Sequence, residues 1–250
     1  MLKADFHIHT KEDPIDRRYI PYTAKDLVRF AAKKGFQVLS ITNHHSLYFN
    51  RQIESFAKKK GILLIPGAEA RIKGKDVVLI NIQKGDLRRI KKFSHLEKIM
   101  DSALIIAPHP YFIKAECLGH LLVKNIDYFH AIEYSHFYTS FFVTPFFRFL
   151  NGNTKAEKVA KKYKKTLVGT SDAHKFYEFN KTYTWVNSAK KKDDVIDAVK
   201  RNKVRLVSKP MTPYYFFRRI AGDIIKNTIP QKLHLRKGVP KDFEEFIQKI

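Results

Sequence analysis

Two histidines one residue apart stand in an apolar run near the start of the chain, in the heptapeptide ADFHIHT (residues 4–10). Alternate side chains of an extended strand point to the same face, so we expect Asp5, His7 and His9 to share one face. The two imidazoles would then lie roughly 7 Å apart along the strand, which is close enough to bind one metal ion. A buried pair of hydrogen-bonded histidines is the alternative, and the rest of the chain must decide between the two.

Five further apolar runs end in a polar tail that carries His, Asp or Glu, namely TNHH, GAEA, APHP, IEYSH and TSDAH. If these runs are parallel strands, their carboxyl ends meet on one face of the fold. Nitrogen and carboxylate donors gathered there favour a metal cluster of zinc, manganese or iron rather than calcium. The candidate ligands are His7, His9, His44, Glu69, His109, Asp172 and His174.

Helical and strand patterns alternate along most of the chain, which predicts an α/β fold with a parallel sheet, either open or closed into a barrel. Strands are expected over residues 2–10, 37–44, 62–72, 102–110, 130–136, 165–174, 182–188 and 203–208. Residues 74–82 are expected to form the return arm of a hairpin. Amphipathic helices are expected over residues 23–35, 47–61, 155–165 and 191–202, the first of them capped by Thr23 and ended by Gly35.

Composition limits the class of protein. The 250 residues, 44% of them hydrophobic, suit one large folded α/β domain. Cys117 is the only cysteine, which excludes a disulfide or a thiolate metal site within the chain, and we expect it to be a buried filler. No apolar run approaches the roughly 20 residues of a membrane span, and the N-terminus lacks the pattern of a signal peptide. We therefore expect a cytoplasmic protein.

The formal charge of +24 favours a polyanionic partner such as nucleic acid. However, the basic clusters AAKKG, AKKKG, RRIKK and AKKYKK fall mostly where a helical pattern ends. Cations are stabilised at helix carboxyl ends by the helix dipole. In a βα-repeating fold these ends lie on the face opposite the carboxyl ends of the strands. We therefore expect most of this charge to lie away from the candidate site.

In combination, the motifs resemble the PHP domain, which is named after polymerase and histidinol phosphatase. They read Asp5-Phe-His7-Ile-His9, Thr42-Asn43-His44, Gly67-Ala-Glu69, His109-Pro110 and Ser171-Asp172-Ala-His174. The resemblance covers roughly residues 1–210. It implies a distorted seven-stranded TIM-like β/α barrel, two to three divalent metal ions (Zn, Mn or Fe) and hydrolysis of phosphate esters. Residues 211–250 break the pattern and are expected to form a helical extension packed on the barrel.

The resemblance also implies a role for each matching position. His7, His9, Glu69 and Asp172 would bind a first metal ion, Glu69 would bridge to a second ion that also takes His109, and His44 and His174 would bind a third. Asn43 stands where the family has an aspartate, which removes a negative charge beside the third ion. Asp76 replaces a hairpin histidine as a ligand of the second ion, with His95 as the competing candidate. Asp13, or alternatively Asp16, would complete the third site.

The expected reaction is attack on a phosphate ester by metal-bound water, supported by Asp172, Glu69 and His174. Basic residues near the strand ends could hold the substrate phosphate, namely Arg17, Arg18, Arg71 and Lys175. The expected substrate is a phosphorylated small molecule or a nucleotide. The alternatives are a nuclease acting on oligonucleotide ends, a metallohydrolase of the amidohydrolase type, and a nucleic-acid-binding barrel without catalysis.

Two aromatic stretches have no role in this reaction, residues 136–152 and 212–225. They are interpreted as core and tail packing, or else as a stacking wall for a base or an apolar patch for a partner. The sequence does not indicate the oligomeric state.

Overall fold

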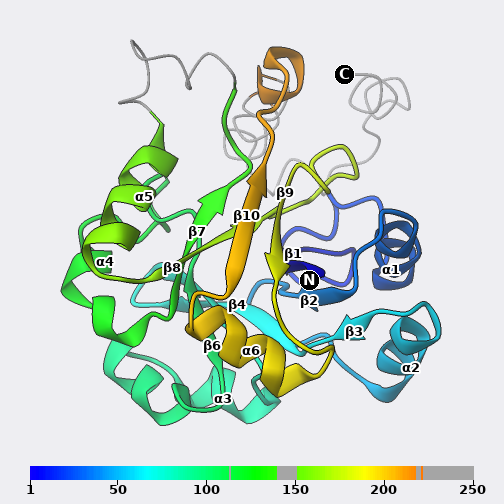
Figure 1. The fold of residues 1–250 in the computed structure, drawn as a ribbon, viewed down its shortest axis with the longest axis horizontal. Coiled ribbons are helices and arrows are strands. Elements are labelled where there is room, and N and C mark those ends of the chain that lie inside the picture. Colours follow the sequence, from blue (N-terminus) through cyan, green and yellow to red (C-terminus); the bar gives the residue numbers. More distant parts are fainter. Residues whose placement is uncertain (113, 140–150, 218–220, 222–250) are drawn as a thin grey trace, which may run out of the picture.

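The computed structural model describes residues 1–112, 114–139, 151–217 and 221. Within these residues, ten strands form two five-stranded sheets with the orders β10-β9-β1-β2-β3 and β4-β5-β6-β7-β8. Helices α1 and α2 lie on one side of the molecule, and α4 and α5 lie on the other (Figure 1). No helix in the described part of the chain is long and apolar enough to cross a membrane.

The first sheet contains the chain's N-terminal strand at its centre. Its members are β1 (Leu2–Ile8), β2 (Val38–Ile41), β3 (Leu63–Leu64), β9 (Thr182–Val186) and β10 (Val204–Ser208). Strands β1, β2 and β3 are parallel, whereas β9 runs antiparallel to both β1 and β10.

The second sheet combines a hairpin with a parallel half. Its members are β4 (Gly67–Ile72), β5 (Lys75–Ile80), β6 (Leu104–Ala107), β7 (Ala131–Ser135) and β8 (Thr166–Thr170). Strands β4, β5 and β6 pair antiparallel, and β6, β7 and β8 pair parallel. The hairpin of β4 and β5 confirms the return arm predicted over residues 74–82.

Six α-helices and two 3₁₀ helices connect the described strands. They are α1 (Ala24–Lys33), α2 (Arg51–Lys59), α3 (Lys84–Arg89), η1 (Phe93–Ile99), α4 (Leu121–Lys124), η2 (Ile126–Tyr128), α5 (Gly152–Lys162) and α6 (Lys192–Lys200). The predicted cap of α1 is confirmed, because the Thr23 side chain accepts a hydrogen bond from the Asp26 backbone N–H in a capping box. Each of these α-helices has Lys or Arg in its last turn, as the clusters of positive charge predicted.

The α/β class is confirmed, but the described strands do not close into the seven-stranded barrel that we expected. The segment predicted as one strand over residues 62–72 divides at Pro66, which lacks the N–H needed for a continuous ladder. Its first part, β3, is the edge of the first sheet, and its second part, β4, begins the second sheet. Most of the predicted C-terminal extension, residues 218–220 and 222–250, lies outside the described residues.

Short bridges join the two sheets along two seams. One bridge pairs Ile8, at the end of β1, with Ala173, just after β8. The other pairs His44, just after β2, with Glu69 in β4. Because each bridge lies beside residues of the predicted ligand set, the places where the sheets meet are also the places where the candidate site is built.

Three apolar clusters hold these layers together. The central cluster joins the sheets and includes Phe6 from β1, Val78 from β5 and Val168 from β8. A second cluster packs the outer face of the second sheet against α5 and the 3₁₀ helices, and a third packs the first sheet against α1 and α2. Burial of apolar area in these clusters is the main driving force for folding.

The two sheets lie in close contact at Gly169 in β8. The hydroxyl of Thr184 in β9 accepts a hydrogen bond from the N–H of Gly169 and donates one to its carbonyl, both at 2.9 Å. A Cβ atom at Gly169 would lie 2.8 Å from the carbonyl oxygen of Tyr183, and a backbone atom of this kind cannot move aside cheaply. The glycine therefore allows the contact between the two sheets.

We predict that Gly169→Ala lowers the free energy of unfolding by about 1–3 kcal/mol, the usual cost of overpacking a filled interior. Denaturant unfolding followed by circular dichroism measures this change. Gly85→Ala is the matched control, because a Cβ there meets nothing closer than Arg89 at 3.9 Å and alanine favours the helix. Equal stability of the two variants would contradict the close approach of the sheets.

Candidate metal centre

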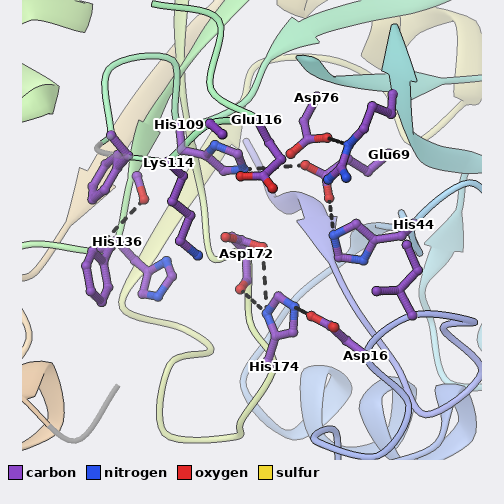
Figure 2. Close-up of a pocket in the computed structure, with 16 residues that line it drawn as sticks. Asp16, His44, Glu69, Asp76, His109, Lys114, Glu116, His136, Asp172 and His174 are labelled. Carbon is purple, nitrogen blue, oxygen red and sulfur yellow. Dashed lines mark hydrogen bonds and ion pairs between the residues drawn. The ribbon is translucent and has the colours of Figure 1, made fainter. Parts of the chain in front are cut away.

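The predicted ligands converge on one cavity of about 540 Å³ at the seam between the sheets. Figure 2 shows His44 and Glu69 on one side of this cavity, with Asp172, His174 and His109 facing them. His7 and His9 lie beneath, both fully buried. The seven residues selected from the strand ends are therefore brought together in space.

A register shift in β1 changes the direction in which the two histidines of the HxH motif point. Asp5 pairs with Leu39, but Ile8 pairs with Ile41, so β1 contains one extra residue between these positions. In agreement, Phe6 packs in the central cluster, whereas Ile8 packs in the third cluster, between the first sheet and helices α1 and α2. Strict alternation would put both on one face, and a bulge of this kind re-aims side chains.

Asp5 consequently does not join the histidines, contrary to our expectation of a shared face. Its Oδ1 accepts the backbone N–H groups of His7 and Ser171 at 3.3 and 3.1 Å. Burial raises the pKa of Asp5 to about 7, although these hydrogen bonds oppose the shift. Asp5 thus ties β1 to the segment that follows β8.

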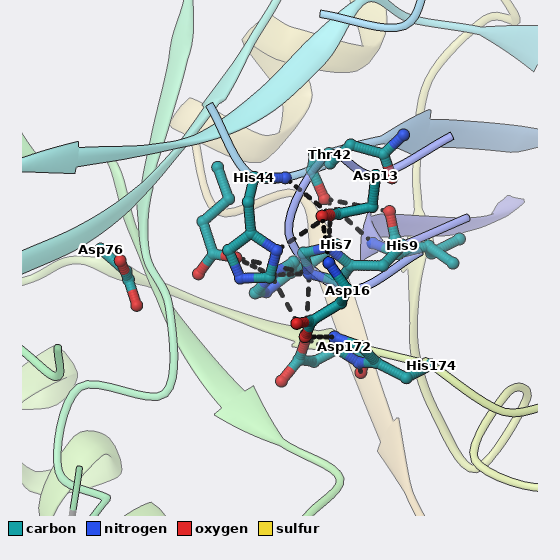
Figure 3. Close-up of polar contacts among 12 residues, drawn as sticks. His7, His9, Asp13, Asp16, Thr42, His44, Asp76, Asp172 and His174 are labelled. Carbon is teal, nitrogen blue, oxygen red and sulfur yellow. Dashed lines mark hydrogen bonds and ion pairs between the residues drawn. The ribbon is translucent and has the colours of Figure 1, made fainter. Parts of the chain in front are cut away.

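Three of the histidines have their Nδ1 atoms occupied by buried carboxylates. The Nδ1 of His7 lies 2.7 Å from Oε2 of Glu133. The Nδ1 atoms of His9 and His44 lie 3.0 and 2.9 Å from the same oxygen of Asp13 (Figure 3). A carboxylate accepts hydrogen bonds, so each Nδ1 donates to it, and loss of the proton on Nε2 would free a lone pair for a ligand.

The other two histidines are held by groups of the main chain and by a thiol. The Nδ1 of His174 lies 2.9 Å from the carbonyl oxygen of Asp172, and the Nδ1 of His109 lies 3.4 Å from Sγ of Cys117. Cys117 is buried, as predicted, but it contacts a candidate ligand and is more than a filler. In all five histidines, therefore, Nε2 is the atom left for the cavity.

The Nε2 atoms gather around the carboxylate of Glu69. Four of them, from His7, His9, His44 and His109, lie within 3.2–3.4 Å of its two oxygens. The Oε1 atom of Glu69 is buried, and its contact with Nε2 of His109 at 3.4 Å lacks the geometry of a hydrogen bond. A buried acceptor without a donor is costly, and a cation would satisfy it.

The donor atoms form three overlapping groups with the spacing that a metal ion requires. These groups are His7, His9 and Glu69; Glu69, Asp76 and His109; and His9, His44 and His174, each with its ligand atoms within 4.8 Å of one another. Imidazole nitrogen and carboxylate oxygen together suit zinc, manganese or iron. The residues present therefore fit a cluster of divalent cations.

The electrostatic field of the site favours positive charge. Burial lowers the pKa of His7, but the surrounding carboxylates, led by Asp172, outweigh burial and raise that pKa to about 10. Burial raises the pKa of Glu69, but His7 and His44 outweigh it and hold that pKa well below its usual range. The same field would stabilise divalent cations, whose binding to histidine displaces protons.

Asp13 and Asp16 take different places. Asp13 is fully buried, and its Oδ2 contacts the Nδ1 atoms of His9 and His44. It therefore lies on the side of both rings opposite to Nε2, the nitrogen that would bind a metal ion. Asp16 lines the cavity, with Oδ2 3.2 Å from the Nε2 of His174. The geometry thus favours Asp16 as the acidic residue of the third group, although Asp13 was named first in the sequence analysis.

The structure also distinguishes between Asp76 and His95, the two candidates for a ligand of the second ion. Asp76 lines the cavity within the group of Glu69 and His109 and lies apart from the dense cluster of histidines in Figure 3. Its Oδ1 is 2.9 Å from Nε of Arg71. Burial and the Glu69 carboxylate raise the pKa of Asp76. His95 is half-buried, with Nδ1 3.0 Å from the carbonyl oxygen of Arg89, and it does not line the cavity.

Asn43 is hydrogen-bonded to Thr10 and does not line the cavity, and the effect of its missing charge stays a prediction. Its Oδ1 accepts the N–H of Thr10 at 2.9 Å, and its Nδ2 donates to the Thr10 hydroxyl at 3.1 Å. Asn43 is fully buried and does not line the cavity. Asn43 thus joins the ends of β1 and β2 through Thr10.

Of the four basic residues proposed to hold a phosphate, Arg71 lines the cavity, whereas Arg17, Arg18 and Lys175 do not. Lys114, which the sequence analysis did not select, extends into the cavity (Figure 2).

Two further residues at the site were missed. Glu133 is fully buried beneath His7, and His136, which is 2% exposed, lines the cavity beside Lys114 (Figure 2). Both belong to the tail IEYSH, which was recognised as a strand end without selecting its glutamate or its histidine. The polar content of that tail was the available signal.

Two candidate ligands have an unusual backbone. His109 and Asp172 have φ angles of 29° and 44°, in the left-handed region that residues other than glycine rarely adopt. Strain of this kind persists where the surrounding structure enforces it, and it is concentrated at functional sites.

Comparison with known proteins places this geometry in context. Residues 151–204 match the family described as PHP-associated. An uncharacterized protein of Methanocaldococcus jannaschii is 27% identical over 125 residues, which cover 47% of this chain and 73% of that protein.

Several solved structures share the fold. A two-domain protein of Bacteroides vulgatus, named as containing a predicted PHP-like metal-dependent phosphoesterase, matches with a TM-score of 0.59 and 19% identity. The match covers 83% of this chain but only 64% of that protein. PsfC of Pseudomonas syringae matches with a TM-score of 0.54 and 15% identity, over 91% of this chain and 98% of PsfC. An amidohydrolase of Chromobacterium violaceum matches with a TM-score of 0.50 and 12% identity, over 88% and 96% of the two chains.

We predict that Glu133→Gln weakens metal binding about 10- to 100-fold, because an amide holds the Nδ1–H of His7 less strongly than a buried carboxylate does. Competition with a chromophoric chelator measures the affinity. Glu54→Gln, on the exposed face of α2, is the matched control and should bind metal as the wild type does. Unchanged affinity in folded Glu133→Gln protein would show that this contact does not support a ligand.

We further predict that Asp76→Ala removes one class of bound metal and lowers affinity there about 10- to 100-fold or more, since even supporting contacts of a ligand have that effect. His95→Ala, a change at a half-buried position outside the cavity, should alter neither metal content nor affinity. Elemental analysis after gel filtration checks both variants. Equal effects of the two changes would remove Asp76 from the ligand set.

Proposed function

We propose that this chain, whose motifs, PHP-associated segment and fold match the PHP family, is a metal-dependent hydrolase of phosphate esters. The substrate is a small phosphomonoester or a phosphorylated molecule of nucleotide size. The observation that carries the proposal is the gathering of four histidine Nε2 atoms around the buried carboxylate of Glu69.

The three donor groups suggest which residues would hold which ion. His7, His9, Glu69 and Asp172 would hold the first ion, and Glu69, Asp76 and His109 the second. His44 and His174, with Asp16, would hold the third. His136 lines the same cavity and could add a nitrogen donor to the second group.

Divalent cations in these positions would supply Lewis acidity toward a phosphoryl group and lower the pKa of water to near neutrality. The chain's own contribution is to fix the donors. Asp13 and Glu133 keep the Nδ1 atoms of three histidines protonated and oriented, so that only Nε2 faces the cavity. The reaction would then require no nucleophile from the protein, in agreement with the position of Cys117, whose thiol is turned to His109.

Two cations of the cavity wall are suited to hold the phosphate. Arg71 is paired with Asp76 through Nε, which leaves the two terminal nitrogens of its guanidinium as further donors. Lys114 extends into the cavity from the loop that follows His109 (Figure 2). A phosphoryl group bound between these residues and the metal ligands would meet positive charge from two sides.

The distribution of charge favours a small ester over an oligonucleotide. The described α-helices each place Lys or Arg in their last turn, which accounts for part of the charge of +24 through the helix dipole. A cavity of about 540 Å³ matches a molecule of small-ligand size. A nuclease acting on strand ends remains the second candidate, because the same ions would bind a terminal phosphate.

We predict that exhaustive chelation abolishes hydrolysis of small phosphate esters and that zinc, manganese or iron restores it at two to three equivalents per chain. Glu69→Gln should lower both metal content and activity about 100-fold or more, because it removes the charge that the groups share. Elemental analysis and release of inorganic phosphate measure the two quantities.

The control is Glu54→Gln, which carries the same chemical change on the surface. A panel that includes a short single-stranded oligonucleotide and a cyclic amide separates the alternatives. Metal-loaded protein that cleaves the amide but no phosphate ester would overturn the proposal in favour of an amidohydrolase. A strand-selective activity that falls steeply with salt would instead support the nuclease.

A further inference from the structure

Two phenylalanines line the metal-binding cavity without contributing to metal or phosphate binding. Phe112 and Phe137 are half-buried, and their ring centroids lie 5.4 Å apart at an angle of 56°. One follows the candidate ligand His109 by three residues, and the other directly follows His136. An apolar surface is therefore built into a cavity whose other walls carry many charged side chains.

The surroundings of both rings are ordered. Phe137 stacks on Phe216, which is 8% exposed, with centroids 4.8 Å apart and an angle of 29°. The backbone N–H of Phe137 donates to the Ser135 hydroxyl at 3.2 Å. The Phe112 N–H donates to the carbonyl of His109, also at 3.2 Å. The aromatic wall is thus held by the same segments that position the ligands.

The loop that carries Phe112 is fastened to the second sheet. The carbonyl of Glu116 accepts the N–H of Asp76 at 2.9 Å, and the N–H of Gly119 donates to the carbonyl of Pro110 at 2.8 Å. The same loop supplies Lys114. One short segment therefore presents both an ammonium group and an aromatic ring to the cavity.

The ammonium group and the aromatic rings together match a phosphate ester that carries a phosphate at one end and a flat ring at the other. The ammonium and the metal ligands suit a phosphate, whereas half-buried aromatic rings gain most from a flat ring that removes their faces from water. A ligand made of phosphate alone, or of phosphate on a short polar alcohol, would leave both rings unused.

We propose that Phe112 and Phe137 form the subsite for the leaving group, and that the preferred substrate is a phosphomonoester whose alcohol carries a flat aromatic ring. The inference rests on the proposed phosphoesterase function and specifies its substrate class. The phosphate would bind on the side of the metal ligands, with Lys114 between the two halves of the substrate.

Phosphonates test the subsite, because their P–C bond is not hydrolysed and binding is measured apart from catalysis. The ligands are methylphosphonate, benzylphosphonate and cyclohexylmethylphosphonate, titrated calorimetrically into the metal-loaded full chain. Benzylphosphonate should bind about 10-fold more tightly than methylphosphonate, and at least about 3-fold more tightly than its saturated analogue. A nucleoside phosphonate, in which a sugar separates ring and phosphorus, reports how far from the phosphate the ring binds.

Phe137→Leu should reduce the affinity ratio of benzylphosphonate to methylphosphonate to about 3 or less. Phe217→Leu is the matched control, because Phe217 is 66% exposed and does not line the cavity. Its ratio should equal that of the wild type. A second variant, Phe112→Leu, should act in the same direction as Phe137→Leu.

The two proposals fail in different ways. If methylphosphonate binds only in the presence of metal and neither ring-bearing ligand binds more tightly, the aromatic subsite is wrong and the phosphoesterase proposal stands. Equal affinity for the benzyl and cyclohexylmethyl ligands overturns the preference for a flat ring. If no phosphonate binds the metal-loaded protein, the proposed function itself is contradicted.

Discussion

The buried carboxylate of Glu69 is the group on which the arrangement of the site depends. Four imidazole nitrogens lie within 3.4 Å of it, and they come from β1, from the segment after β2 and from the segment after β6. Its backbone is fastened as firmly as its side chain, because its N–H donates to the carbonyl of Thr42 and its carbonyl accepts the N–H of His45. The bridge that joins the two sheets and the carboxylate shared by two of the three donor groups are thus parts of a single residue.

A second layer of acceptors makes this concentration of polar groups tolerable inside the protein. Uncompensated burial of a carboxylate or an imidazolium is strongly unfavourable, so each must be paired. Asp13 and Glu133 each hold an imidazole on the side away from the cavity, and the bulge in β1 turns His7 and His9 toward the partners that they need. The specificity of the site for cations therefore resides as much in these supporting contacts as in the ligands themselves.

The sequence predicted the elements and most of the site because both leave local signals. Apolar runs followed by His, Asp or Glu located seven candidate ligands, and the Thr23 cap was visible in its spacing. The bulge between Asp5 and Ile8 has no local signal, since the apolar alternation continues through it. Glu133 could have been selected from the polar tail IEYSH, whereas Lys114 could not, because its importance depends on how the loop after β6 meets the cavity. The division of one predicted strand at Pro66 did have a local signal, because proline lacks an N–H. The failure of the closed barrel follows from the pairing of the strands in two sheets, which has none.

The position of β1 has a consequence for synthesis of the chain. Among the described strands β1 is synthesised first, and it is the central strand of its sheet, with β2 on one side and β9, residues 182–186, on the other. Its bridge partner Ala173 is also made late. Until those segments emerge, a nascent chain presents an unpaired strand edge bearing two histidines, and such edges recruit other strands. Products that terminate before residue 173 should therefore be prone to aggregate, and the period between the first strand and its last partner is the interval in which this chain most needs a chaperone.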